Sequence, residues 1–181
     1  MKKSYFLLVL LLAFYPAFPV EPVNPSATEN VRKVLHYLNR IKGNGILTGQ
    51  QNLATDVMSW TNDVFKITGK FPALLGEDFS YGDDTRKKRL NIVNAAVDQW
   101  KNGGLVTISW HQVNPDTWSG SANEGSFRET QQPMSEERFN KLLQDTTEIH
   151  KKYIAHIDTI ATYLKMLRDS GVVVLWNLTT K

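Results

Sequence analysis

Polar and aromatic side chains gather at three points along the chain, each directly after a short apolar run. They are Gln50, Gln51 and Asn52, then Glu77 and Asp78, then Trp110, His111, Gln112 and Asn114, with Trp118 a few residues further on. Amide, carboxylate and imidazole groups exchange hydrogen bonds with hydroxyl groups, and indole planes stack on the C–H faces of sugar rings. This combination predicts a carbohydrate-binding site, provided that the fold brings the three points together.

The two adjacent carboxylates do not form a catalytic pair. Retaining hydrolysis of a glycosidic bond needs two carboxyl groups about 5–5.5 Å apart across the bond. Glu77 and Asp78 are consecutive in an expected strand, so their side chains point to opposite faces of a sheet. Asp116 could approach Asp78 from a loop, but no feature of the sequence fixes their separation.

Four short apolar segments are expected to be strands, and helical segments alternate with them. These strands cover residues 46–50, 71–79, 105–109 and 172–176. Such alternation predicts parallel strands, and right-handed crossovers place all their C-terminal ends on one side of the sheet. A doubly wound open sheet is the alternative, but no Gly-x-Gly-x-x-Gly turn follows the first strand.

The helices are predicted from apolar residues at helical spacing. Ser26 and Glu29 fit a capping box that opens the first helix. Trp60 and Ile67 share the face of the second helix that we expect to pack inward. Gly103 and Gly104 are expected to end the third helix. The second, third and fourth helical segments cover residues 54–68, 85–101 and 135–169, and the fourth has a break near His150.

The N-terminus has the pattern of a secretory signal peptide over residues 1–20. Lys2 and Lys3 precede an apolar run at residues 5–14, which is too short for a membrane-spanning helix of about 20 residues. Residues 21–27 are expected to form a linker. The chain is therefore expected to be secreted or periplasmic, without a membrane contact after cleavage; an uncleaved N-terminal anchor is the alternative.

The composition narrows the classes of partner. The chain has no cysteine, so disulfides and cysteine-bound metals are excluded, and the six-residue spacing of His150 and His156 does not fit a metal site on one helix face. No metal or cofactor is predicted. The net charge of +3 falls to 19 basic against 18 acidic residues without Lys2 and Lys3. This balance gives no argument for a nucleic-acid partner and suits an uncharged polymer.

Three segments together resemble the start of glycoside hydrolase family 26, the endo-β-1,4-mannanase family. They are ILTGQQN (46–52), ITGKFPALLGEDFSYG (67–82) with Trp60 before it, and GGLVTISWHQVNPDTW (103–118). GVVVLW (171–176) is similar to the fourth strand of that family. The resemblance implies an α/β fold of parallel (β/α) units, namely a (β/α)8 TIM barrel truncated to about its first four strands over residues 28–176.

The resemblance also implies a function and a set of substrate-binding residues. The family cleaves β-1,4-mannosidic linkages in mannan by retaining double displacement, without a cofactor. By this comparison His111 lines the sugar subsite next to the scissile bond, and Asp78 lies near the floor of the site. Trp110 either stacks on a sugar or fills the barrel mouth, Trp118 is a platform for a distal subsite, and Gln51 also contacts substrate.

Both catalytic glutamates of the family are expected to be absent. The acid/base lies in an Arg-Pro-Leu-His-Glu segment after the fourth strand, and the nucleophile follows the seventh. Here Trp176 is followed by a non-matching tail at residues 177–181, which predicts a frameshift or premature end and a chain that is inactive alone. Three alternatives stay open: a sugar-binding half-barrel that self-associates through its open edges, another β-glycanase specificity, and an unrelated α/β binding domain.

Overall fold

The computed structural model describes residues 20–53, 55–80, 87–112, 114–115 and 133–178. The chain divides into two units, Met1–Gly45 and Ile46–Lys181. No helix in the described ranges is long and apolar enough to cross a bilayer. The predicted signal peptide lies outside these ranges except for its last residue.

The first unit contains one described helix, α2 (Glu29–Ile41), whose cap differs from the prediction. Thr28 is the N-cap, and its side chain accepts a hydrogen bond from the Val31 amide at 3.4 Å. The Ser26 amide donates instead to Oδ1 of Asn24 at 2.9 Å. The predicted capping box at Ser26 is therefore wrong, because the chain is still turning around Asn24 at that point.

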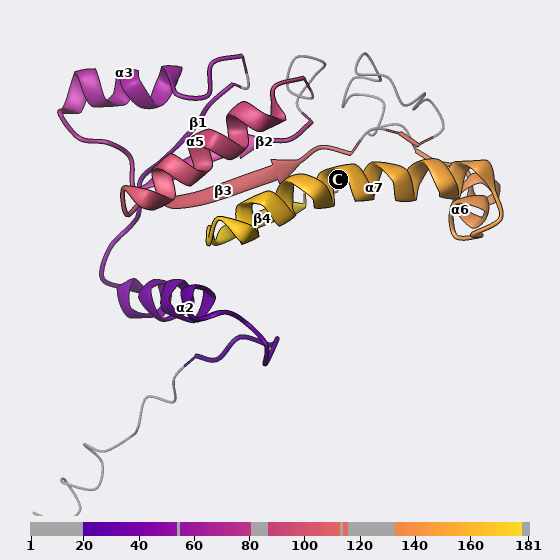
Figure 1. The fold of residues 1–181 in the computed structure, drawn as a ribbon, viewed down its shortest axis with the longest axis horizontal. Helices are drawn as coiled ribbons and strands as arrows, with labels where there is room; N and C mark the ends of the chain where they lie inside the picture. Colours follow the sequence, from indigo (N-terminus) through magenta and orange to yellow (C-terminus); the bar gives the residue numbers. More distant parts are fainter. Residues whose placement is uncertain (1–19, 54, 81–86, 113, 116–132, 179–181) are drawn as a thin grey trace, which may run out of the picture. The chain divides into compact units, whose positions relative to one another are not determined.

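The second unit alternates strands and helices along one parallel sheet (Figure 1). The strands pair in the order β1-β2-β3-β4, and every pairing is parallel. The predicted parallel α/β architecture is thus confirmed, and the sequential order is that of a barrel wall. The elements are β1 (Gly49–Gln51), α3 (Ser59–Thr68), β2 (Leu74–Asp78), α5 (Arg89–Lys101), β3 (Leu105–Trp110), α6 (Glu136–Leu142), α7 (Glu148–Asp169) and β4 (Val174–Leu178).

Glycine turns set where the strands begin. Gly171 has a φ of 74°, and the next amide, Val172, donates to the carbonyl of Leu167 at 3.0 Å. This arrangement is a Schellman cap on α7, so β4 starts two residues later than predicted. Gly103, with a φ of 82°, ends α5 in the same way, as the sequence predicts.

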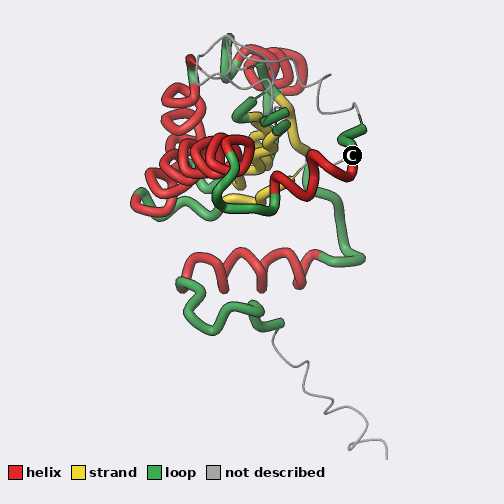
Figure 2. Tube along the Cα trace, turned by 90° about the vertical axis from the view of Figure 1, so that its right-hand side faces the viewer, coloured by secondary structure: helices red, strands yellow, loops and turns green. Residues whose placement is uncertain are grey.

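One face of the sheet carries the apolar core. Val106, Ile108 and Trp110 of β3 pack with buried residues of α5 and α7, which run alongside β3 in Figure 1. Figure 2, turned by 90°, shows the strands in yellow with helices beside them in red. Side chains alternate along a strand. Leu75 and Glu77 of β2, and Phe79 directly after it, therefore share this core face, whereas Asp78 lies on the opposite face, which we call the open face.

The prediction that Trp60 and Ile67 pack inward is wrong for the described residues, since Ile67 is 84% exposed and Trp60 is also exposed. The buried residue of α3 is Thr61. Its amide donates to Oδ1 of Asn52 at 3.0 Å, and its hydroxyl accepts from Nδ2 of Asn52 at 2.9 Å. This pair of hydrogen bonds turns α3 so that Thr61, and not its apolar stripe, faces the sheet.

Two strands lie at the edges of the described sheet. β1 pairs only with β2, and β4 pairs only with β3, within the part of the chain that the structure describes. Backbone groups along such edges can pair with another chain. Self-association through these edges stays a prediction.

Gly76 lets β1 approach β2 closely, and its replacement by alanine is expected to destabilise the chain. A Cβ atom at Gly76 would lie 2.6 Å from Oε1 and 3.1 Å from Cα of Gln51. Because a backbone atom blocks it, β1 must shift, which costs roughly 1–3 kcal/mol. Urea denaturation of Gly76→Ala and of Gly45→Ala, where nothing lies within 4 Å, checks this expectation. Equal midpoints for the two variants would show that β1 adjusts freely.

Candidate functional site

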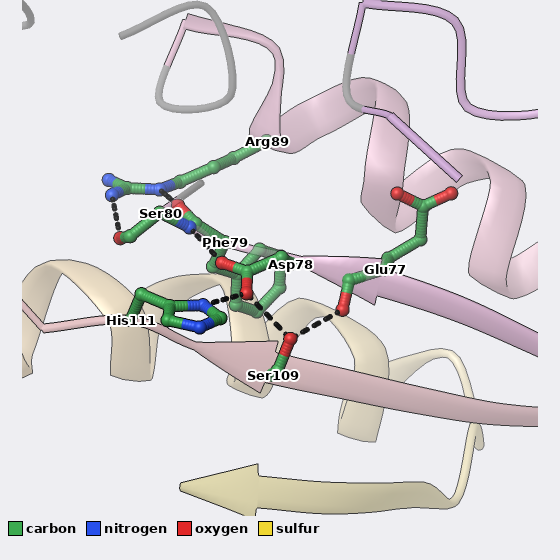
Figure 3. A network of polar contacts seen from close by, with 7 residues as sticks. All are labelled: Glu77, Asp78, Phe79, Ser80, Arg89, Ser109 and His111. Atoms are coloured by element: carbon green, nitrogen blue, oxygen red, sulfur yellow. Dashed lines mark hydrogen bonds and ion pairs between the residues drawn. The ribbon is translucent and has the colours of Figure 1, made fainter. Parts of the chain in front are cut away.

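Asp78 is the centre of a hydrogen-bond network at the C-terminal ends of β2 and β3 (Figure 3). Its Oδ1 accepts from the Ser80 amide at 2.7 Å, and its Oδ2 accepts from the Ser109 hydroxyl at 2.6 Å. The same Oδ2 contacts Nδ1 of His111. Asp78 is only 5% exposed, and three partners of this kind are what a buried carboxylate requires.

The strand register brings these groups together. Asp78 and Ser109 are direct partners in the parallel pairing of β2 with β3. Paired residues of parallel strands point to the same face, and His111 follows two residues after Ser109 on that face. The sequence-predicted convergence of Asp78 and His111 therefore follows from one register.

The contact with Asp78 fixes the orientation of the His111 ring. A carboxylate only accepts hydrogen bonds, so Nδ1 of His111 must carry the hydrogen. The ring is then held by one edge, and its Nε2 edge is directed away from Asp78. The side chain of His111 is 29% exposed, so a ligand on the open face can reach it.

Arg89 holds the end of β2 from the first residue of α5. Its Nε donates to the Phe79 carbonyl at 2.7 Å, and its Nη2 donates to the Ser80 hydroxyl at 3.1 Å. The guanidinium carbon lies 5.7 Å from the centre of the Tyr163 ring, and Arg89 is only 5% exposed. These contacts fix the backbone immediately after Asp78.

Glu77 points into the core face, away from this network. It is fully buried, and no donor in the described part of the chain reaches either carboxylate oxygen. Burial, and to a smaller extent the neighbouring charge of Asp78, raises the pKa of Glu77 to about 8. Glu77 and Asp78 thus lie on opposite faces, as strand geometry predicts, and cannot flank one glycosidic bond.

The remaining predicted site residues lie in different surroundings. Gln51 is exposed on β1 and pairs with Gly76, on the same face as Asp78. Trp110 is 4% exposed and packs edge-on against His156, with the ring centres 5.1 Å apart. That position favours packing, one of the two uses of Trp110 that the sequence left open. Trp118 and Asp116 lie outside the described residues.

Sequence reasoning missed Ser80, Ser109 and Arg89. Ser109 left a weak signal, since it is a hydroxyl residue in an otherwise apolar strand that ends at the predicted site. Ser80 and Arg89 left none. An arginine at the start of a helix is usually exposed, and its inward direction depends on the packing of α5 against β2.

Comparison with known proteins settles the family. The sequence profile of Glycosyl hydrolase family 26 matches residues 23–180. The chain belongs to this family. The resemblance drawn from residues 46–52, 67–82 and 103–118 is therefore confirmed.

Two relatives to which this chain is similar in sequence are named as mannanases. A mannan endo-1,4-β-mannosidase of Thermothelomyces thermophilus is 33% identical over 84% of this chain and 32% of its own length. The enzyme of the same name from Bacillus subtilis is 28% identical over 96% of this chain and 50% of its own length. The chain therefore spans half or less of the length of these relatives.

Solved structures of the family match the fold. GH26A from Muricauda sp. MAR_2010_75 superposes with a TM-score of 0.76 at 31% identity, over 86% of this chain and 49% of that structure. A GH26-CBM35 β-(1,4)-mannanase of Podospora anserina gives a TM-score of 0.69 at 27% identity, over 90% of this chain and 37% of that structure. The four parallel strands thus correspond to part of a family-26 fold.

Proposed function

We propose that this chain supplies one wall of a β-1,4-mannan-binding site, and that the whole protein to which such a wall belongs is a mannan hydrolase. The observation that carries the proposal is the Asp78–His111–Ser109 network at the C-terminal ends of β2 and β3. This is the side on which barrels of this class build their active sites. The mannanase names of the relatives support mannan as the polymer.

The network suits recognition of a sugar hydroxyl. Asp78 holds the Nδ1 edge of His111, so the Nε2 edge meets the ligand in a fixed orientation. A pre-oriented imidazole loses little rotational freedom on binding. Gln51 lies on the same face and offers an amide donor and acceptor.

The described residues bind and orient the sugar but do not break the glycosidic bond. Hydrolysis with retention needs two carboxyl groups on one face, about 5–5.5 Å apart. Asp78 stands on the open face with its oxygens occupied by three donors, and Glu77 lies on the opposite face. Glu77 and Asp78 are therefore not the acid/base and the nucleophile, and it is part of the proposal that the 181-residue chain alone releases no reducing ends from mannan.

Export of the chain is part of the proposal. The pattern of Lys2 and Lys3 followed by the apolar run at residues 5–14 supports it, since a polymeric substrate is met outside the cell. Mannan is proposed over the other β-glycans of the family because the named relatives act on mannan.

Calorimetric titration with mannohexaose tests the proposal. The wild-type chain is expected to bind, and His111→Ala is expected to weaken binding roughly tenfold or more through loss of an oriented hydrogen bond. His36→Ala, an exposed histidine of α2, is the matched control and should bind like the wild type. Equal affinity of the His111 and His36 variants, or release of reducing ends by the wild type, would contradict the proposal.

A further inference from the structure

The side chain of Arg89 lies one step behind the network that holds His111. It reaches from α5 back to the end of β2, where it donates to the Phe79 carbonyl and the Ser80 hydroxyl. A guanidinium is costly to bury, and directed hydrogen bonds such as these two offset part of that cost. They fix both the backbone after Asp78 and the side chain of Ser80.

Ser80, which Arg89 holds in place, in turn fixes the carboxylate of Asp78. Its amide donates to Oδ1 of Asp78 at 2.7 Å, which anchors one oxygen of the carboxylate. The other oxygen, Oδ2, is then turned toward β3, where it meets Ser109 and Nδ1 of His111. Figure 3 shows this continuous path from Arg89 through Ser80 and Asp78 to the imidazole.

We infer that Arg89 is a positioning residue for His111, which it orients through Ser80 and Asp78. The orientation of the ring follows from the geometry alone, whereas its consequence for sugar binding rests on the proposed function. The hydrogen bonds that join Arg89 to the end of β2 go to the Phe79 carbonyl and the Ser80 hydroxyl, so this path from Arg89 to the imidazole runs through Ser80 and Asp78. It sets which nitrogen of His111 carries the hydrogen, because it keeps Oδ2 of Asp78 facing Nδ1.

A purely structural role for Arg89 makes a different prediction. Arg89 also packs over the Tyr163 ring, so its loss would lower stability in either case. Only a positioning role changes the tautomer of His111 in variants that remain folded. The tautomer of an imidazole is read directly from the chemical shifts of its two ring nitrogens.

Nitrogen NMR of His111 in the full chain, at alkaline pH where imidazoles are neutral, is the test. Wild type is expected to hold the Nδ1–H tautomer. Arg89→Met should raise the ratio of the Nε2–H to the Nδ1–H form roughly tenfold, the effect of losing about one net hydrogen bond. Arg89→Lys, with a single ammonium for two acceptors, should give an intermediate ratio.

Ile92→Val is the matched control, because Ile92 is a fully buried residue of the same helix whose apolar side chain donates and accepts no hydrogen bond. It should lower the urea midpoint and leave the His111 nitrogens unchanged. If Arg89→Met does not fold, the tautomer ratio of His111 in Arg89→Lys tests the positioning role instead. Unchanged nitrogen shifts in folded Arg89 variants would overturn the inference.

Adding mannohexaose to the same samples separates the two claims. If the wild-type His111 signals do not respond to the sugar, the proposed function fails, and the tautomer ratios still decide the role of Arg89. If they respond and Arg89→Met weakens the response as well as shifting the tautomer, both claims stand.

Discussion

Replacing Glu77 by glutamine is expected to flatten the pH dependence of folding and to stabilise the chain above neutral pH. Glu77 is fully buried, and no described residue donates to its carboxylate. Burial raises the pKa of Glu77 from 4.5 to about 8. The folded chain therefore keeps a proton that the unfolded chain releases.

The sign of the effect follows from this retained proton. The contribution of Glu77 to stability is fully present below pH 4.5 and is lost as the pH rises toward 8. Within this window the free energy of unfolding falls by about 1.4 kcal/mol per pH unit from this group alone. Above a pH of about 8 the carboxylate is charged in both states, and no further loss occurs. A glutamine side chain cannot ionise, so the Glu77→Gln variant lacks this slope.

Urea denaturation of wild type and Glu77→Gln at about pH 5 and about pH 8.5 measures the difference. The two proteins should be similar at the lower pH, and the variant should be more stable by a few kcal/mol at the higher pH. Glu137→Gln, at an exposed site on α6, is the control and should follow the wild type. Parallel pH curves for wild type and Glu77→Gln would show that the carboxylate finds a partner when it ionises.

Replacing Asp78 by alanine is expected to cost roughly 2–4 kcal/mol of stability and to weaken sugar binding roughly tenfold, as loss of an oriented His111 would. The substitution removes an acceptor from the Ser80 amide, the Ser109 hydroxyl and His111 together. Donors buried without an acceptor carry a desolvation penalty in addition to the lost bonds. His111 also loses the group that fixes its ring.

Two controls separate the role of Asp78 from a general effect of losing a carboxylate. Asp98→Ala removes an exposed aspartate on α5 and should change neither stability nor binding appreciably. Ser109→Ala removes one donor and leaves Asp78 with its other partners, so its cost should be about 1 kcal/mol. Stability and mannohexaose affinity are measured on all three variants. An Asp78 variant as stable as Asp98→Ala would contradict the network as described.

Local sequence rules predicted the parallel sheet on which the site is built. The alternation of apolar strands with helices predicted a parallel sheet, and the period of two along a strand placed Glu77 and Asp78 on opposite faces. The glycine stop at Gly103 also follows from a local rule. These features depend on neighbours in sequence, which is why composition and spacing are sufficient for them.

Features that depend on contacts between elements could not be read from the sequence. Helical spacing put Trp60 and Ile67 on one face, but the hydrogen bonds between Asn52 and Thr61 decide which face of α3 is buried. The pattern around Trp110 is equally compatible with stacking on a sugar and packing on α7. Arg89 meets Ser80 only because α5 starts beside the end of β2.

The most direct test of mannan binding at the open face is the nitrogen–proton spectrum of the His111 imidazole during titration with mannohexaose, with cellohexaose as the matched sugar. Mannohexaose is expected to shift the Nε2 signal while the Nδ1–H bonded to Asp78 stays in place, and cellohexaose is expected to have a weaker effect. Ring signals of His111 that are unchanged at saturating mannohexaose would contradict the claim that this open face binds mannan.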